Sequence, residues 1–327
     1  MKKLIQEGKS IILITHKLKE IMSVCDRCTI IRKGVGVGTV NVKETNPDEL
    51  AALMVGREVH FKTEKKTATP KEAVLTIKEL VVEDSRGVGA VSSLNLSVRA
   101  GEIVGIAGVD GNGQTELIEA ITGLRKIKSG SITLKNQELS TLSTRKITES
   151  GVGHIPQDRH KHGLVLDYTI GENIGLQTYY QKPMSKSGIL NYKELYKKAK
   201  ELIAEYDVRT PSEYTQARSL SGGNQQKAII AREVDRSPEL LIAAQPTRGL
   251  DVGAIEFIHK KLIEERDKGR AVLLVSLELD EVMNLSDRIA VIYEGNIVDV
   301  VDPKETNEQE LGLLMAGGTR EKAGGTA

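Results

Sequence analysis

The sequence after residue 107 reads Gly108-Val109-Asp110-Gly111-Asn112-Gly113-Gln114-Thr115. It follows an apolar run at 103–107 that is typical of a buried parallel strand, and it precedes a helical pattern over 115–122. Glycines spaced in this way between a strand and a helix let backbone N–H groups close around phosphate oxygens. Gln114 stands where such loops usually carry lysine, so this position can donate a hydrogen bond but brings no charge. An ordinary glycine-rich turn remains the alternative if the motif stands alone.

Further motifs follow in the chain. The octapeptide Leu220-Ser221-Gly222-Gly223-Asn224-Gln225-Gln226-Lys227 precedes a helix predicted over 225–235. Three short motifs accompany it: Ile155-Pro156-Gln157-Asp158, Pro246-Thr247 and Gly249-Leu250-Asp251. In this order the motifs resemble those of ATP-binding-cassette (ABC) transporter ATPases. More narrowly, the chain is similar to the tandem two-cassette ATPases of carbohydrate and nucleoside importers, and especially to the second cassette of nucleoside importers that work with lipoprotein receptors of the basic-membrane-protein type.

The resemblance implies an α/β fold of the P-loop NTPase class. In this family a RecA-like core with a parallel sheet carries an antiparallel β subdomain and an inserted α-helical subdomain, expected here at about 160–235. The sequence pattern agrees, because residues 74–80 and 94–98 alternate as antiparallel strands do, and residues 240–243 form an apolar run. Residues 192–206 have a helical pattern.

The chain contains an internal repeat: residues 8–56 match residues 269–317. His16 aligns with Leu277, 261 positions later, and the apolar run Ile11–Ile14 aligns with 272–275. We therefore expect residues 1–60 to be the C-terminal remnant of a first cassette, 61–73 to be a linker, 74–318 to be a complete second cassette and 319–327 to be a flexible tail. Ile11–Ile14 is predicted to be a buried strand that needs neighbours on both faces.

The resemblance assigns the binding residues by motif. The nucleotide-binding set is Gly108, Gly111, Asn112, Gly113, Gln114, Thr115, Glu116 and Gln157. ATP and Mg²⁺ are the implied cofactors, with Thr115 and Gln157 as weak magnesium ligands through ATP. The residues offered in trans to a partner cassette are Ser221, Gly222, Gly223 and Asn224, and Asp251 belongs to the family's D-loop.

The family's catalytic positions are altered. The strand at 240–243 should end in Asp-Glu, which would hold magnesium and accept a proton from the attacking water, but it continues as Ala244-Gln245. The family's γ-phosphate histidine is replaced by Leu277, whereas His16 occupies that position in the remnant. We expect no intact catalytic set in the complete cassette, and negligible turnover by the isolated chain. Gln245 leaves slow hydrolysis open, because glutamine orients the attacking water in some GTPases.

Composition limits the possible partners. With 46 lysines and arginines against 45 acidic residues, the chain has no general electrostatic basis for binding nucleic acid or anionic lipid, so partners must be argued from local sites. No apolar run approaches the length of a membrane span. We expect a cytoplasmic subunit, peripheral on the membrane, whose partners are the missing first cassette or a second cassette chain, permease subunits and, indirectly, an extracytoplasmic substrate-binding lipoprotein. A non-catalytic nucleotide-binding or dimerisation module is the alternative.

The two cysteines, Cys25 and Cys28, have a C-x-x-C spacing. This spacing occurs in redox motifs and zinc sites, but no second cysteine pair is present to complete a zinc site. Small buried residues where a helix leads into a strand are the simpler interpretation.

Overall fold

The computed structural model describes residues 1–32, 34–58 and 64–319. The chain divides into two compact units, residues 1–63 with 249–260, and residues 64–248 with 261–327. The start of the predicted linker and all but one residue of the predicted tail lie outside the described residues. None of the helices in the described ranges combines the length and hydrophobicity of a membrane-spanning segment.

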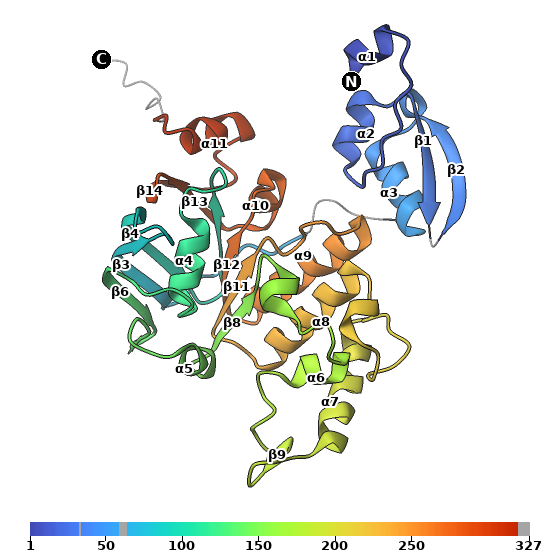
Figure 1. The fold of residues 1–327 in the computed structure, drawn as a ribbon. Coiled ribbons are helices and arrows are strands. Elements are labelled where there is room, and N and C mark those ends of the chain that lie inside the picture. The colour runs from blue at the N-terminus through green and yellow to red at the C-terminus, as the bar shows by residue number, and fades with distance from the viewer. Residues whose placement is uncertain (33, 59–63, 320–327) are drawn as a thin grey trace, which may run out of the picture. The chain divides into compact units, whose positions relative to one another are not determined.

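The larger unit is built around a six-stranded sheet with the order β14-β13-β5-β12-β11-β8 (Figure 1). Its strands are β5 (Ile103–Ala107), β8 (Val152–Ile155), β11 (Leu240–Ala244), β12 (Ala271–Val275), β13 (Arg288–Tyr293) and β14 (Asn296–Val301). All neighbours pair in parallel except β13 and β14. Every residue of β5, β11 and β12 is buried, as strands covered on both faces require. The parallel strands predicted from the apolar runs are therefore confirmed.

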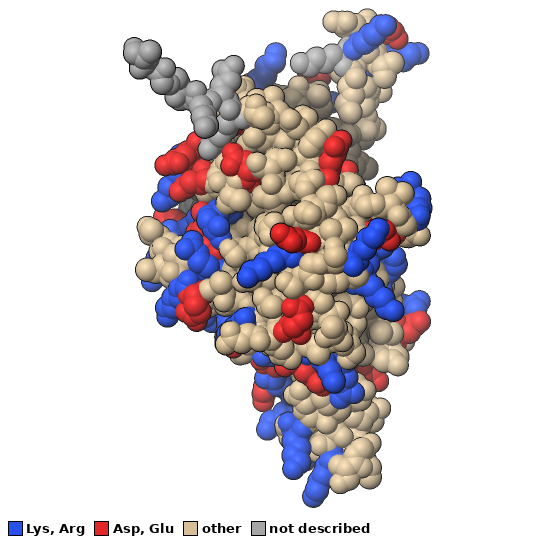
Figure 2. All heavy atoms as spheres, turned by 90° about the vertical axis from the view of Figure 1, so that its left-hand side faces the viewer, with Lys and Arg blue, Asp and Glu red and all other residues tan. Residues whose placement is uncertain are grey.

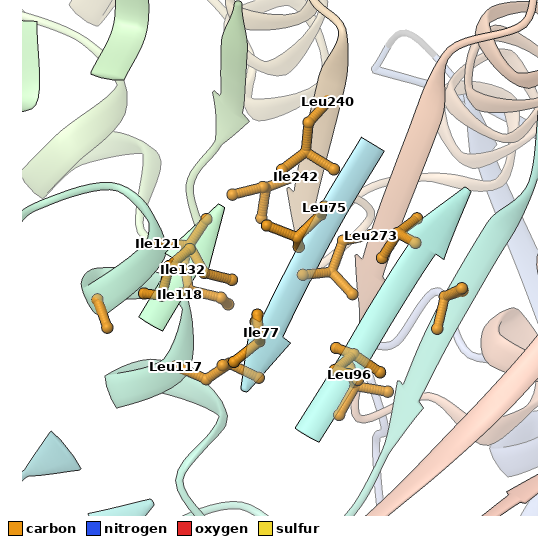
Figure 3. Packing of buried hydrophobic residues seen from close by; sticks show 14 of the residues in the cluster. Leu75, Ile77, Leu96, Leu117, Ile118, Ile121, Ile132, Leu240, Ile242 and Leu273 are labelled. Carbon is orange, nitrogen blue, oxygen red and sulfur yellow. The ribbon is translucent and has the colours of Figure 1, made fainter. Parts of the chain in front are cut away.

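A second sheet has the order β4-β3-β6-β7 and is antiparallel throughout. Its strands are β3 (Ala73–Glu83), β4 (Gly89–Arg99), β6 (Ser129–Leu134) and β7 (Gln137–Glu138). Side chains from both sheets and from α4 (Gln114–Ile121) pack into one hydrophobic cluster, in which Leu75, Leu117 and Leu273 are fully buried (Figure 3). This shared core fixes the start of α4 against the end of β5.

The remaining helices of this unit complete the P-loop NTPase ABC cassette fold. They are α5 (Thr144–Glu149), the short helix η2 (Arg159–Gly163), α6 (Ile170–Gly175), α7 (Tyr192–Glu205), η3 (Ala217–Ser219), α8 (Gly222–Asp235), α10 (Leu279–Leu285) and α11 (Glu308–Met315). Helices α6, α7 and α8 pack on one another between β8 and β11 in the chain, with the hairpin β9 (Ser185–Lys186) and β10 (Ile189–Leu190) between α6 and α7. Helix α9 (Val252–Asp267) follows β11 in the chain; its residues up to Lys260 belong to the smaller unit and the rest to the larger one.

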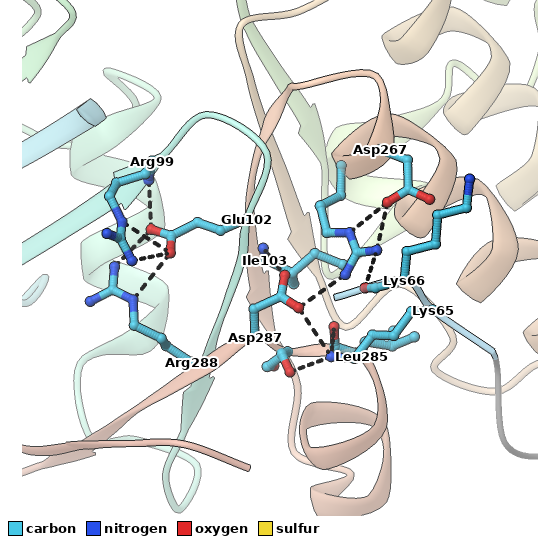
Figure 4. Close-up of polar contacts among 11 residues, drawn as sticks. Lys65, Lys66, Arg99, Glu102, Ile103, Asp267, Leu285, Asp287 and Arg288 are labelled. Atoms are coloured by element: carbon cyan, nitrogen blue, oxygen red, sulfur yellow. Dashed lines mark hydrogen bonds and ion pairs between the residues drawn. The ribbon is translucent and has the colours of Figure 1, made fainter. Parts of the chain in front are cut away.

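Two buried ionic clusters tie the strand ends of this unit together (Figure 4). Asp287 accepts hydrogen bonds from the Ile103 N–H at 2.9 Å and from Arg266, whose side chain is 1% exposed, at 3.0 Å. Lys65, from the predicted linker, donates to the Leu285 carbonyl at 3.0 Å and also pairs with Asp287. Glu102 is fully buried and binds Arg99 and Arg288. Removing Asp287 or the fully buried Glu102 would be costly because it takes away acceptors that several donors share.

The smaller unit contains α1 (Lys2–Gln6), α2 (Leu18–Val24), β1 (Arg27–Arg32), β2 (Val35–Asn41), the short helix η1 (Val42–Glu44) and α3 (Pro47–Val55). Strands β1 and β2 form an antiparallel pair. Cys25 is the C-cap of α2 and Cys28 lies in β1, where the helix leads into the strand as predicted. Both are free thiols that pack against the small hydrophobic cluster of this unit, and both are partly rather than fully buried. In the described parts of the chain, no group of three or more His, Cys, Asp or Glu side chains is placed so that it could hold a metal ion.

The prediction of a buried strand at Ile11–Ile14 was wrong. Residues 9–15 have no regular secondary structure, and Ile12 and Ile14 are 91% and 95% exposed. The aligned strand β12 is buried because β11 and β5 pair with its two edges. The smaller unit supplies Ile11–Ile14 with no such neighbours among its described residues, so the apolar run has nothing to pair with.

Apart from that segment, helices and strands of the first copy have counterparts in the second copy 261 positions later. Helices α2 and α10, strands β1 and β13, and helices α3 and α11 all begin 261 positions apart. Local hydrogen bonds recur too: Asn46 caps α3 as Asn307 caps α11, and Thr45 donates to Glu49 as Thr306 donates to Glu310. The repeated sequence therefore folds locally in the same way twice, except at the segment that requires a sheet.

Candidate nucleotide-binding site

The carboxyl ends of the parallel strands lie at one edge of the core sheet, where ligands bind in open α/β folds. The glycine-rich loop 108–113 leaves β5 at this edge, and Gln157 follows β8. Gln245 follows β11, and Leu277 lies two residues beyond the end of β12. The structure thus brings these separate motifs, predicted from sequence, to the same edge.

The glycine-rich loop needs glycine at specific places. Gly111 and Gly113 have φ values of +90° and +97°, a region that side chains rarely adopt. At Gly113 a Cβ atom would lie 2.2 Å from the Ala90 carbonyl oxygen. Gly113 is also the N-cap of α4 and offers no capping side chain, so the loop leads into a helix start whose N–H groups can serve an anion.

Gln114 folds back across this loop. Its side chain is 7% exposed, and its Nε2 donates a hydrogen bond to the Val109 carbonyl at 3.0 Å. A Cβ atom on Gly108 would lie 2.7 Å from the same nitrogen, so Gly108 makes room for the amide. The position that usually carries a lysine therefore closes the loop with a neutral hydrogen bond.

Asn112 fixes the loop to the turn between β13 and β14. Its Oδ1 accepts from the Glu294 N–H at 2.9 Å, and its carbonyl accepts from the Gly295 N–H at 3.2 Å. In the first turn of α4, Thr115 is exposed and Glu116 is partly buried. The Thr115 hydroxyl is thus open to solvent beside the loop, as a ligand for phosphate-bound magnesium would have to be.

The end of β11 carries no acid or base. Ala244 is buried, and its methyl group cannot hold a cation or take a proton. Gln245 is 8% exposed with φ at +48°, and its N–H donates to the Val275 carbonyl at 2.7 Å. Leu277 is 39% exposed and is likewise inert. The three positions to which the resemblance assigns the chemistry therefore hold side chains that do not ionise.

The glutamine loop is shaped by Asp158. Its carboxylate accepts from the N–H groups of Lys161 at 3.0 Å and His160 at 2.9 Å, and these bonds hold the pKa of Asp158 below its ordinary value. They start the short helix η2 directly after Gln157, which is partly buried. Gln157 is thereby held on a short, capped connection.

The Ser221–Asn224 segment forms the start of α8. Ser221 is the exposed N-cap, and Asn224 donates to its hydroxyl at 2.9 Å while accepting from the Arg209 N–H at 2.8 Å. Gly222 and Gly223 occupy the first turn. The serine and the helix start are open to solvent, and the N–H groups of the first turn have no side-chain cap, an arrangement that can accept an anion.

Sequence reasoning missed two residues near these motifs. Arg159 donates to the Arg248 carbonyl at 3.2 Å, and its Nη2 lies 2.8 Å from where a Cβ atom on Gly222 would be. Glu281 accepts from the buried Thr247 hydroxyl at 2.8 Å. The only sequence signal for Arg159 is its place two residues after Gln157, because its contacts come from segments distant in the chain.

Two predicted site residues lie in the smaller unit. Asp251 accepts from the Ala254 N–H at 2.9 Å and so caps the start of α9. His16 is partly buried and precedes α2, where the hydroxyl of Thr15 accepts from the Lys17 N–H at 3.0 Å. In the other copy Ser276 accepts from the Glu278 N–H at 3.1 Å. The turn around the histidine position is thus the same in both copies.

Residues 91–248 match the family described as "ABC transporter". The chain is 71% identical over 324 residues to the guanosine import ATP-binding protein NupO of Bacillus subtilis, covering 99% of this chain and 64% of that protein. It is 61% identical over 318 residues to the nucleoside import ATP-binding protein NupA of Lactococcus lactis, covering 97% and 63%. The chain thus spans less than two thirds of the length of these relatives.

Solved structures agree on the fold. The dimeric structure of a post-hydrolysis state of the ATP-binding cassette MJ0796 bound to ADP and Pi is matched over 71% of this chain and all of that chain, with a TM-score of 0.61 and 24% identity. A chain described as an ATP-binding subunit of an ABC transporter is matched over 74% and 99%, with a TM-score of 0.62 and 20% identity. From the family match and the two import proteins, the chain belongs to the ABC transporter ATPase family and is close to nucleoside import ATP-binding proteins.

Proposed function

We propose that this chain is the nucleotide-binding part of an ABC importer, that it binds ATP at a degenerate site, and that it supplies Ser221–Asn224 to the catalytic site of a partner cassette. The observation that carries the proposal is the contrast between the phosphate-binding part of the site and the part that should perform the chemistry. The glycine-rich loop keeps a backbone fitted to phosphate, whereas the adjacent strand ends hold Ala244, Gln245 and Leu277.

The residues fit a nucleotide phosphate better than they fit a tightly held metal. Positive φ values at Gly111 and Gly113 and the uncapped start of α4 favour an anion held by main-chain N–H groups. Mg²⁺ prefers oxygen ligands and is usually bound through one or two carboxylates and substrate phosphates. Here the protein offers the Thr115 hydroxyl and the Gln157 amide oxygen, both neutral, so we expect magnesium to arrive with ATP and to bind weakly.

The intact half-site is the start of α8. Ser221 is exposed and the helix start carries no side-chain cap, so the hydroxyl and the N–H groups of Gly222 and Gly223 can face a γ-phosphate held by another cassette. Hydrolysis in the full assembly would then occur at a site formed by the partner's glycine-rich loop and this chain's Ser221–Asn224 segment.

The internal repeat supports residues 1–60 as the end of a first cassette, with 74–318 as the second. The elements of the two copies coincide, and the segment that fails to form a strand, Ile11–Ile14, is the one that would need a parallel sheet around it. We infer that the remainder of a first cassette, in cis or as a separate chain, provides that sheet. His16 would then stand in the histidine position of that cassette.

Nucleosides are the substrate class that we propose. The two relatives with 71% and 61% identity are described as guanosine and nucleoside import proteins, whereas a glucose import ATP-binding protein of Haloferax volcanii is 43% identical. The chain would act on the cytoplasmic face of the membrane with permease subunits, and indirectly with an external binding lipoprotein. Selectivity among substrates would lie in those partners.

The test is to measure ATP hydrolysis by the purified chain, by the front part of the first cassette with its permease, and by all of them together. We expect negligible phosphate release from the chain alone and stimulated hydrolysis in the full assembly. Ser221→Arg should abolish the stimulation while leaving ATP binding by this chain unchanged. Ser219→Arg changes another exposed serine, two positions earlier, and is the matched control. Equal hydrolysis with and without this chain would refute the proposal.

A non-catalytic nucleotide-binding module is the second candidate, and the inert groups at positions 244, 245 and 277 favour it. It predicts that the chain binds ATP or ADP but never stimulates a partner. Ser221→Arg would then have no effect in any mixture, which distinguishes the two functions.

A further inference from the structure

A short hairpin projects from the helical part of the larger unit. Strands β9 and β10 pair Lys186 with Ile189 across a two-residue turn, Ser187-Gly188. Both turn residues have positive φ, +51° and +80°, as the tight turns favoured in hairpins require. Figure 1 shows β9 beside the start of α7, at the end of this part of the fold. The backbone of the hairpin therefore forms a regular turn at Ser187-Gly188, which we call the tip together with Ile189.

The tip is apolar and exposed. Ile189 is 75% exposed and Tyr192, at the start of α7, is 52% exposed. The Tyr192 ring stacks on Tyr196, which in turn packs against Tyr214 at 4.3 Å between ring centroids. The exposed Ile189 side chain buries little apolar surface within this fold. It would contribute hydrophobic stabilisation only if another surface covered it.

The sequence around this tip is rich in lysine. Residues 182–200 contain six lysines and one glutamate, in a chain whose net charge is +1. Lys193, Lys197 and Lys200 follow one another at helical spacing along α7, on the face opposite its buried residues Leu195, Ala199 and Leu202. Figure 2 shows blue side chains beside tan ones in the narrow lower part of the molecule.

Most of these charges are not paired within the described part of the fold. Of the six lysines, Lys198 pairs with Asp235 at 2.6 Å. The other five form no ion pair with a carboxylate in the residues that the structure describes. A row of unneutralised ammonium groups next to an exposed isoleucine and a tyrosine combines the two features of an interfacial membrane contact: attraction to anionic headgroups, and a side chain that enters the boundary of the acyl chains.

We propose that the hairpin and the lysine face of α7, comprising Lys186, Ile189, Tyr192, Lys193, Lys197 and Lys200, form a docking surface for an anionic lipid bilayer. The lysines lie against the headgroups and Ile189 enters the interface. The apolar face of α7 is already buried in the protein, so the helix contacts the membrane through its charged face. This surface lies outside the glycine-rich loop and the Ser221–Asn224 segment, and it does not depend on ATP binding or hydrolysis.

The experiment is co-sedimentation of the full chain with vesicles of phosphatidylcholine alone or with roughly a third phosphatidylglycerol. We expect binding to the anionic vesicles only, and its loss in about 0.5 M salt, where charges are screened within a few ångströms. The triple variant Lys193→Glu, Lys197→Glu, Lys200→Glu should lower the partition coefficient at least about tenfold, because each basic residue near an anionic surface is worth about fivefold. Ile189→Ser should lower it by a smaller factor of about two to five.

Exposed residues elsewhere in the same unit provide the controls. Lys126→Glu changes an exposed lysine, and Val88→Ser changes a valine that is 57% exposed; both should leave vesicle binding unchanged. All variants should melt at the wild-type temperature, since the altered side chains are exposed. Equal binding to neutral and anionic vesicles, or wild-type binding by the triple variant, would overturn the proposal. So would binding only to vesicles that contain the permease, because the surface would then serve a protein.

Discussion

The Gln114 side chain donates to the Val109 carbonyl at 3.0 Å, across the loop that would surround a phosphate. A lysine at this position would place a positive charge on the phosphates, whereas the amide binds the loop itself. Gln114 therefore bonds the loop to itself without providing charge, as the degenerate site that we propose would do.

Replacing Gln114 should change nucleotide affinity in both directions. We expect Gln114→Lys to tighten ATP binding about tenfold, because a charge-assisted contact to phosphate replaces a neutral one. Gln114→Ala should weaken it by a few fold, since the loop loses its internal bond. Titration with a fluorescent ATP analogue measures both. Lysine and alanine variants with the same affinity would show that this side chain does not reach the nucleotide.

Gly113 provides a test of the loop backbone. Gly113→Ala should destabilise the fold by about 2 kcal/mol or more, because alanine is disfavoured at positive φ and its methyl group would lie 2.2 Å from the Ala90 carbonyl oxygen. Gly111→Ala has the same sign of φ but no atom within 4 Å, so it should cost only about 1 kcal/mol. Urea unfolding compares the two variants, and equal costs would contradict the close contact.

The two copies allow a matched test of burial. Leu273→Ala in β12 should cost about 2–5 kcal/mol, since Leu273 is fully buried in the core cluster. Ile12→Ala at the aligned position should change the stability of this chain by less than about 0.5 kcal/mol, because Ile12 is 91% exposed. If the front part of a first cassette covers Ile12, the same substitution should weaken assembly with it. A large cost in the chain alone would show that Ile11–Ile14 is already buried there.

Asp287 and the aligned Asp26 allow a second comparison between the two copies. Asp287→Ala should destabilise the larger unit by about 2–3 kcal/mol, because it removes one of the two carboxylates that pair with the buried Arg266 and the acceptor of the Ile103 N–H. Asp26→Ala, at the aligned position, should be nearly neutral because Asp26 is exposed. Thermal unfolding followed by circular dichroism is sufficient to compare them.

Because of His154, the free energy of unfolding should decrease in mild acid. Burial lowers the pKa of His154 to about 4, whereas an unfolded histidine titrates near the ordinary value of 6.5. The unfolded state therefore binds the proton first, and stability is lost as the pH falls from about 6.5 towards 4, by an amount on the order of 1–3 kcal/mol. In His154→Gln that part of the pH dependence should be absent. Urea unfolding of both proteins across this range measures the difference, and parallel curves would contradict it.

The local sequence determined the motifs, the glycine-dependent turns and the helices. The spacing of glycines around Gly111, the buried runs at 103–107 and 240–243, and the identities of Gln114, Ala244, Gln245 and Leu277 are all readable without coordinates. So is the repeat, whose local hydrogen bonds at Asn46 and Asn307 recur because they involve residues only a few positions apart.

Tertiary structure decided whether the apolar runs became strands. The run at 272–275 pairs with two neighbouring strands and is buried, while Ile11–Ile14 has the same pattern but no sheet to join and lies in solvent. Tertiary structure also placed Arg159 beside Gly222. The physical reason is that turns and helices satisfy their hydrogen bonds locally, whereas a strand needs partners that are distant in the chain.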